Sequence, residues 1–101
     1  MPNVYRKTDT QIQAKVSEPF IIELECNPTT GYQWRLTLDE SSVKLVDQHY
    51  QTAGGGFGGG GLERFVLQPI KGGKTSIRAA YKRQWETTPL QQQDFLVRIS
   101  A

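Results

Sequence analysis

Cysteine and histidine are scarce in this chain of 101 residues, which has one of each, Cys26 and His49. A single cysteine excludes an internal disulfide, so packing has to hold the fold together. One cysteine and one histidine also supply too few ligands for a zinc site of the usual coordination number. We therefore expect no metal ion and no other cofactor.

Long apolar stretches are missing as well. No run approaches the ~18 residues that indicate a membrane-spanning helix, and the first 13 residues lack the apolar core of a secretory signal. The chain has 12 Lys and Arg against 10 Asp and Glu, for a net charge of +2. Because the basic residues are scattered, the footprint of a nucleic-acid-binding protein is absent. We expect neither nucleic acid nor membrane as a partner, and a periplasmic, secreted or cytoplasmic location all fit the sequence.

Residues that could carry catalysis are equally few. A nucleophilic dyad would need Cys26 and His49 side by side, yet Cys26 continues the alternation of Ile22 and Leu24 and is expected to be a small buried apolar residue. The carboxylates are spread along predicted solvent-facing positions, and no pair stands out for general acid–base work. An enzyme is therefore the least favoured class.

The pattern that is present has a period of two. Apolar side chains recur at every second position in short segments, which is typical of half-buried strands, whereas no segment predicts an amphipathic helix. These segments are residues 12–16, 20–26, 33–38, 43–47, 62–68, 75–81 and 94–100. About seven short strands separated by turn residues predict an all-β fold, an immunoglobulin-like antiparallel β-sandwich. The length predicts a single domain over residues 1–101.

Three connections between these segments have unusual sequences: residues 27–32, 53–61 and 82–93. They follow the second, fourth and sixth predicted strands. In an immunoglobulin-type sandwich these connections leave from the same end. We therefore expect the three loops to be neighbours and to form one continuous surface.

The first connection is predicted to be stiff. Pro28 fixes its own φ after Asn27, and Thr29 and Thr30 are restricted at χ1. Gly31 supplies a backbone conformation with positive φ without a steric cost. A stiff exposed loop on a β scaffold suits recognition, because little conformational entropy is lost on docking.

The second connection has seven glycines and Phe57 among its nine residues. Such a run is either a flexible tether or a binding loop whose exposed backbone pairs with a partner's groove. Phe57 favours the binding loop, because a lone aromatic residue among glycines is suited to act as an anchor.

The two tryptophans receive different predictions. Trp34 shares a strand face with Leu36 and is expected in the core, where sandwiches often bury a tryptophan. Trp85 follows no alternation, and it comes two residues after Arg83 in the third connection. Trp and Arg are the residues most enriched at interface hot spots, so an interface role is favoured. The alternative is that Trp85 folds back over an edge of the sandwich.

The three connections, in this order, resemble those of the chagasin family of cysteine-peptidase inhibitors. The family motif N-P-T-T-G-[YF] is matched completely by Asn27-Pro28-Thr29-Thr30-Gly31-Tyr32, and G-x-G-G is matched by Gly58-Gly59-Gly60-Gly61. The third motif, R-P-W, is matched by Arg83 and Trp85, while Gln84 replaces the proline.

The resemblance implies an immunoglobulin-like inhibitor that reversibly occludes the cleft of papain-like peptidases. We also expect the chain to be a monomer. Thr29 and Thr30 would lie nearest the catalytic thiolate of the peptidase. The backbones of Gly58, Gly60 and Gly61 would offer hydrogen bonds along one side of the cleft. Trp85 would press against aromatic residues on the other side, with Arg83 at the rim. The alternative class is a noncatalytic immunoglobulin-like module for adhesion or ligand binding.

Overall fold

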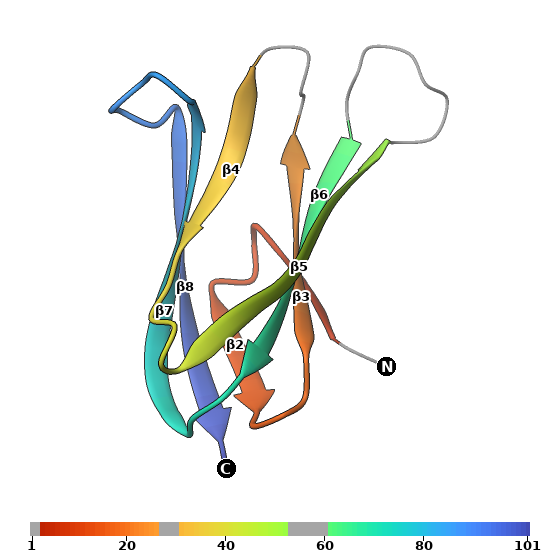
Figure 1. Cartoon of the computed structure of the whole chain (residues 1–101), viewed down its shortest axis with the longest axis vertical. Coiled ribbons are helices and arrows are strands. Elements are labelled where there is room, and N and C mark those ends of the chain that lie inside the picture. The colour runs from red at the N-terminus through yellow and green to blue at the C-terminus, as the bar shows by residue number, and fades with distance from the viewer. Residues whose placement is uncertain (1–2, 27–30, 53–60) are drawn as a thin grey trace.

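The structure, a computed structural model, describes residues 3–26, 31–52 and 61–101. These residues form eight strands and no helix (Figure 1). No helix long and apolar enough to cross a membrane occurs in this part of the chain. The strands are β1 Val4–Arg6, β2 Gln11–Lys15, β3 Phe20–Cys26, β4 Tyr32–Thr37, β5 Val43–Thr52, β6 Gly61–Pro69, β7 Gly73–Arg83 and β8 Gln91–Ser100.

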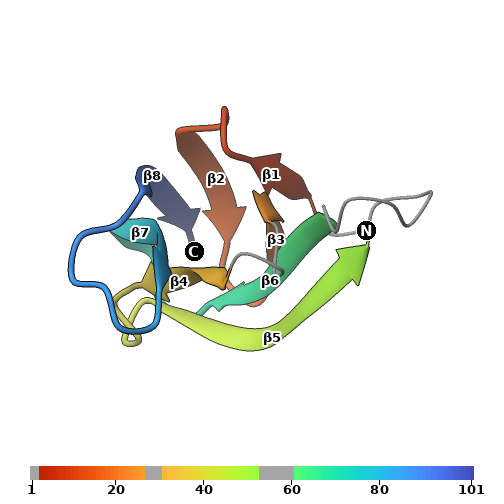
Figure 2. The ribbon, with the colours of Figure 1, turned by 90° about the horizontal axis from the view of Figure 1, so that it is seen from above.

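The strands form two four-stranded sheets that face each other. One sheet has the order β1-β3-β6-β5 and the other has the order β2-β8-β7-β4, and the view from above shows them as separate layers (Figure 2). The orders β1-β3-β6-β5 and β8-β7-β4 correspond to the A-B-E-D and G-F-C sheets of an immunoglobulin sandwich. The predicted fold class is therefore confirmed.

The core lies between the two sheets, and it is built from the positions that the alternation selected. Its buried members, among the described residues, are Ile12, Phe20, Ile22, Leu24, Cys26, Trp34, Val43, Phe65, Leu67, Ile77, Ala79, Tyr81, Phe95, Val97 and Ile99. Trp34 is only 3% exposed, which confirms its predicted place in the core. Burial of these side chains is the main favourable term that holds the sandwich together.

The sequence prediction missed β1, which makes the strand count one too low. The three residues of β1 are too few to show an alternation, and they become a strand through parallel pairing of Val4 with Ile21 and of Arg6 with Glu23. The ring of Tyr5 also packs edge-on against Phe20, with 6.0 Å between centroids. Tertiary contacts, rather than local sequence, therefore define this strand.

The fourth predicted segment also proved longer than expected. β5 runs to Thr52, and its register against β6 shifts between Leu45 and Asp47. A bulge of this kind places one extra residue, here Val46, in one strand and breaks the alternation beyond it. This explains why the period of two fades after Leu45 in the sequence.

A buried carboxylate ties three strands of the first sheet together. Glu23 in β3 is 4% exposed, although it lies on the outer face of the sheet. Its carboxylate accepts a hydrogen bond from Nε of Arg64 at 2.8 Å and lies 3.4 Å from Nε of Arg6. The two guanidinium groups compensate the cost of burying this charge.

Candidate interaction surface

The strand ends that flank the three unusual connections gather at one end of the sandwich, called the loop end below. In the first sheet, Gly61 at the start of β6 pairs with Cys26 at the end of β3 and with Thr52 at the end of β5. In the second sheet, Tyr32 at the start of β4 pairs with Arg83 at the end of β7. Both sets of strand ends lie at the top of the molecule (Figure 1). For these flanking residues, the predicted clustering at one end is confirmed.

Several predicted site residues lie outside the described part of the chain. They are Asn27, Pro28, Thr29 and Thr30 of the first connection, and Phe57, Gly58 and Gly60 of the second. Their roles stay predictions. The predicted site residues that the structure does describe are Gly31, Tyr32, Gly61, Arg83 and Trp85.

Aromatic rings connect the core to the loop end. Trp34 packs against Tyr81 with 4.9 Å between ring centroids, and Tyr81 stacks on Tyr32 at 5.2 Å. The indole N–H of Trp34 donates to the carbonyl oxygen of Glu25 at 2.7 Å. This bond links β4 to β3 and therefore joins the two sheets close to the loop end.

Arg83 continues this stack outwards. Its guanidinium carbon lies 4.6 Å from the centroid of the Tyr32 ring and 5.9 Å from that of Trp85. Both distances are within the range of cation–π attraction. A row of stacked side chains thus runs from the buried core to an exposed indole, in the order Trp34, Tyr81, Tyr32, Arg83 and Trp85.

The end of the first connection meets the third at Gly31. Its φ is +82°, a conformation that side chains other than glycine rarely adopt. A Cβ at this position would be 4.0 Å from Cγ of Arg83 and from Cη2 of Trp85. The glycine of the first motif and the two matching residues of the third are therefore direct neighbours.

Trp85 itself is 75% exposed. The alternative in which it folds back over an edge of the sandwich is therefore wrong. A large apolar side chain this exposed, with a cation beside it, is a feature of interaction surfaces.

The third connection is shorter than the sequence predicted, because β7 extends to Arg83 and β8 begins at Gln91. The β7–β8 loop is therefore residues 84–90. It begins with a turn in which the amide of Glu86 donates to the carbonyl of Arg83 at 3.1 Å. The amide of Arg83 donates in turn to Oε1 of Glu86 at 3.2 Å. Sequence reasoning missed Glu86, for which the only signal is its spacing of three residues from Arg83.

Gly61 is required at the base of the second connection. A Cβ there would overlap the hydroxyl group of Tyr50 and would lie 2.5 Å from the backbone oxygen of Gln51. Because a backbone atom cannot move aside cheaply, we expect Gly61→Ala to lower the free energy of unfolding by about 1–3 kcal/mol. Urea denaturation measures this change.

A matched control exists in the turn between β6 and β7. A Cβ at Gly72 would meet its nearest neighbour at 3.5 Å, an ordinary contact. Gly72→Ala should therefore change stability by no more than about 0.5 kcal/mol. Equal stability of the two variants would contradict the proposed strain at Gly61.

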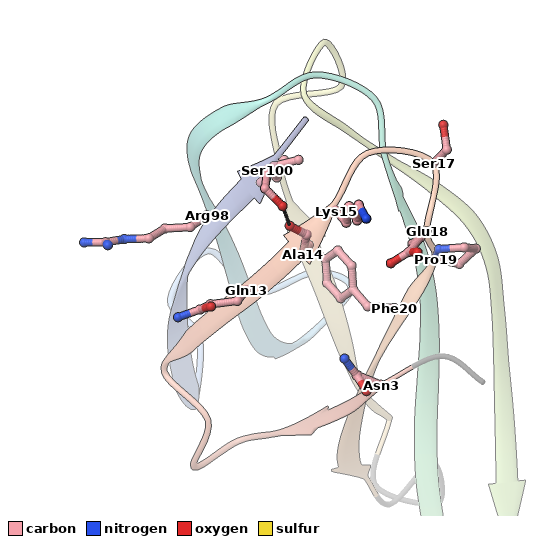
Figure 3. A pocket seen from close by; sticks show the side chains of 11 residues that line it. Asn3, Gln13, Ala14, Lys15, Ser17, Glu18, Pro19, Phe20, Arg98 and Ser100 are labelled. Atoms are coloured by element: carbon pink, nitrogen blue, oxygen red, sulfur yellow. Dashed lines mark hydrogen bonds between the residues drawn. The ribbon is translucent and has the colours of Figure 1, made fainter.

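A hollow of about 800 Å³ with a mixed polar and apolar lining lies at the opposite end of the sandwich (Figure 3). Lys15, Glu18 and Arg98 are among its lining residues, and the Ser100 hydroxyl beside it donates to the Ala14 carbonyl at 3.2 Å. None of the predicted site residues that the structure describes contributes to this hollow. It is therefore separate from the loop end.

The comparison with known families agrees with this geometry. A family model described as "Chagasin family peptidase inhibitor I42" matches residues 13–99. The chain belongs to the chagasin family. Amoebiasin-2 from Entamoeba histolytica is 31% identical to it in an alignment of 68 residues that covers 64% of this chain and 55% of that protein. The chain thus spans about half the length of this curated relative.

Solved structures extend the likeness to the whole sandwich. The cysteine protease inhibitor EhICP2 from Entamoeba histolytica superposes with a TM-score of 0.85 at 24% identity, covering 96% of this chain and 94% of that one. Amebosin superposes with a TM-score of 0.74 at 22% identity, covering 99% and 97%. PbICP-C, solved in complex with falcipain-2, reaches 0.61 at 20% identity, covering 99% and 90%. At these identities the superpositions establish the shared fold.

The chagasin family consists of inhibitors and not of enzymes, and the local geometry of Cys26 agrees. Cys26 faces the core, whereas His49 lies opposite Arg64, which also pairs with Glu23 on the outer face. The thiol and the imidazole are therefore on opposite faces of the sheet. Burial, with a smaller contribution from the charge of Glu63, raises the pKa of the Cys26 thiol to about 11. At neutral pH this thiol is protonated and unsuited to act as a nucleophile.

Proposed function

We propose that this chain reversibly inhibits papain-like cysteine peptidases by blocking the active-site cleft with three adjacent loops. These are the β3–β4 loop (residues 27–31), the β5–β6 loop (residues 53–60) and the β7–β8 loop. Membership of the chagasin family supports this function. The observation that supports it most directly is that a Cβ at Gly31 would be 4.0 Å from side-chain atoms of Arg83 and of Trp85, so residues of two family motifs are close together.

In this proposal the first loop enters the centre of the cleft. Asn27 and Pro28 shape the loop, and Thr29 and Thr30 approach the catalytic thiolate of the peptidase. No covalent bond is needed, because a loop that fills the cleft excludes substrate. The sequence predicts a stiff, bent loop, and such a loop would fail to present an extended backbone in the geometry required for attack. The inhibitor therefore stays intact.

The other two loops act on either side of the first. Gly58, Gly60 and Gly61 offer backbone hydrogen bonds, and Phe57 anchors the second loop. Trp85 packs against aromatic residues of the peptidase, and Arg83 holds it from behind. An interface of about 800 Å² per partner is enough for tight binding when the loops are preorganised.

We further propose that residues 1–101 act as a single inhibitor domain and as a monomer. The buried residues described above form a continuous cluster between the two sheets, which supports one folding unit. Because the three loops share one end, a single copy can present them together.

Titration of papain and of a cathepsin L-like enzyme with the purified chain tests the proposal. We expect reversible, active-site-directed inhibition well below micromolar inhibitor concentration. Replacing Thr29 and Thr30 together by bulky charged residues should abolish inhibition while the circular dichroism spectrum and the melting temperature persist. Absence of inhibition at micromolar concentration would contradict the proposal and would favour a noncatalytic binding module.

A further inference from the structure

We propose that Glu86 is a positioning residue for Trp85 and supplies the rigidity that a proline at position 84 would otherwise give. The inference rests on the proposed inhibition, because Trp85 is the residue offered to the peptidase. It concerns a side chain that none of the three family motifs includes.

Glu86 closes the turn that carries Trp85 from both directions. Its backbone amide donates to the carbonyl of Arg83, and its carboxylate accepts from the amide of Arg83. Glu86 is half-buried, so the bond to its carboxylate is partly shielded from competing water. Both ends of the Arg83–Glu86 turn are therefore fixed to each other, with Gln84 and Trp85 between them.

This turn determines where the indole points. Trp85 is mostly exposed, so little packing holds it, and its described ring contact is with the Arg83 guanidinium at 5.9 Å. Arg83 is itself held by the ring of Tyr32. If the turn opened, Trp85 would move away from Arg83 and from Gly31, and the preorganised surface would be lost.

Position 84 explains why a second constraint is useful here. Gln84 is the second residue of the turn, the position at which proline is favoured because it presets φ near −65°. Glutamine leaves this angle free in the unbound loop. A side chain at the last residue of the turn that bonds back to the first residue compensates for that freedom. Glu86 does so, because its carboxylate accepts a hydrogen bond from the amide of Arg83.

The first test compares Glu86→Ala with Glu86→Gln in papain inhibition. We expect Glu86→Ala to raise the inhibition constant about fivefold to tenfold, as expected for loss of one charge-assisted hydrogen bond. Glu86→Gln keeps the accepting oxygen and should stay within about threefold of the parent chain. Glu40→Ala is the matched control, because Glu40 is exposed in the turn between β4 and β5, and it should have no effect.

The second test asks whether Glu86 acts through Trp85. In the Trp85→Ala background, Glu86→Ala should change the inhibition constant less than about twofold. Gln84→Pro should restore inhibition in the Glu86→Ala chain, because it constrains the same turn. An undiminished effect of Glu86→Ala without Trp85 would mean that Glu86 contacts the peptidase directly, and it would overturn the inference.

A measurement without peptidase separates this inference from the proposed function. The indole N–H of Trp85 should show a lower heteronuclear NOE in Glu86→Ala than in the parent chain, whereas that of Trp34 should be unchanged. If the parent chain does not inhibit papain, the proposed function fails, and this measurement still decides the role of Glu86. Unchanged order at Trp85 would overturn the positioning role.

Discussion

Replacing Trp85 by alanine is expected to weaken peptidase inhibition by about 2 kcal/mol or more, roughly a thirtyfold rise in the inhibition constant. Trp85 offers the largest exposed apolar side chain among the described residues of the loop end, and it lies in the short Arg83–Glu86 turn with the Arg83 guanidinium 5.9 Å from its ring. Binding therefore gains its buried area without a large ordering cost. Steady-state inhibition of papain measures the effect.

The same substitution should leave the fold intact. Because the indole is 75% exposed, its removal creates no cavity, and we expect the free energy of unfolding to change by less than about 0.5 kcal/mol. Leu90→Ala, in the same loop and also exposed, is a matched control that should affect inhibition less. An inhibition constant that does not move in Trp85→Ala would refute the interface role of this residue.

The other tryptophan should behave in the opposite way. Trp34→Ala is expected to lower the free energy of unfolding by about 3–5 kcal/mol, because it empties a large volume in the core. It also removes the indole donor of the bond to Glu25 and the packing against Tyr81. Since domains of this size are stable by only about 5–15 kcal/mol, urea denaturation should show a chain close to unfolding.

Trp34→Phe separates the two contributions. It keeps most of the volume and loses the hydrogen bond, so we expect a loss of about 1–2 kcal/mol. Refolded Trp34→Ala should also inhibit less well, since Trp34 supports Tyr81 and thereby Tyr32. A change in stability below about 1 kcal/mol for Trp34→Ala would show that the core does not depend on this side chain.

Most of the sandwich could be predicted from the sequence, because one buried face per strand imposes a period of two. The prediction failed where strands depend on pairing instead. β1 exists because Val4 and Arg6 pair with β3, and the second half of β5 exists because it follows β6 beyond the bulge at Val46. Neither effect leaves an alternation in the sequence.

The candidate site divides in a similar way. Gly31 and Trp85 could be selected from residue type and motif, because a glycine in a turn and a tryptophan outside the alternation both have recognisable signatures. Arg83 could be selected, but its place between two rings could not, since that depends on Tyr32 lying opposite it across β4 and β7. Glu86 could not be selected, because a carboxylate that binds a backbone amide within a turn looks like any exposed acidic residue.

The opposite end of the sandwich is connected in its own right. The amide of Ser17 donates to the carbonyl of Pro69, and the amide of Ile70 donates to the carbonyl of Ser42, so the short turns there are bonded to one another. Among the described residues, the strands of the two sheets join this end to the loop end. A fluorophore, an affinity handle or an inserted peptide placed at the Gly72 turn should therefore leave the loop end accessible, so that binding at the loop end can be measured on a labelled or immobilised chain.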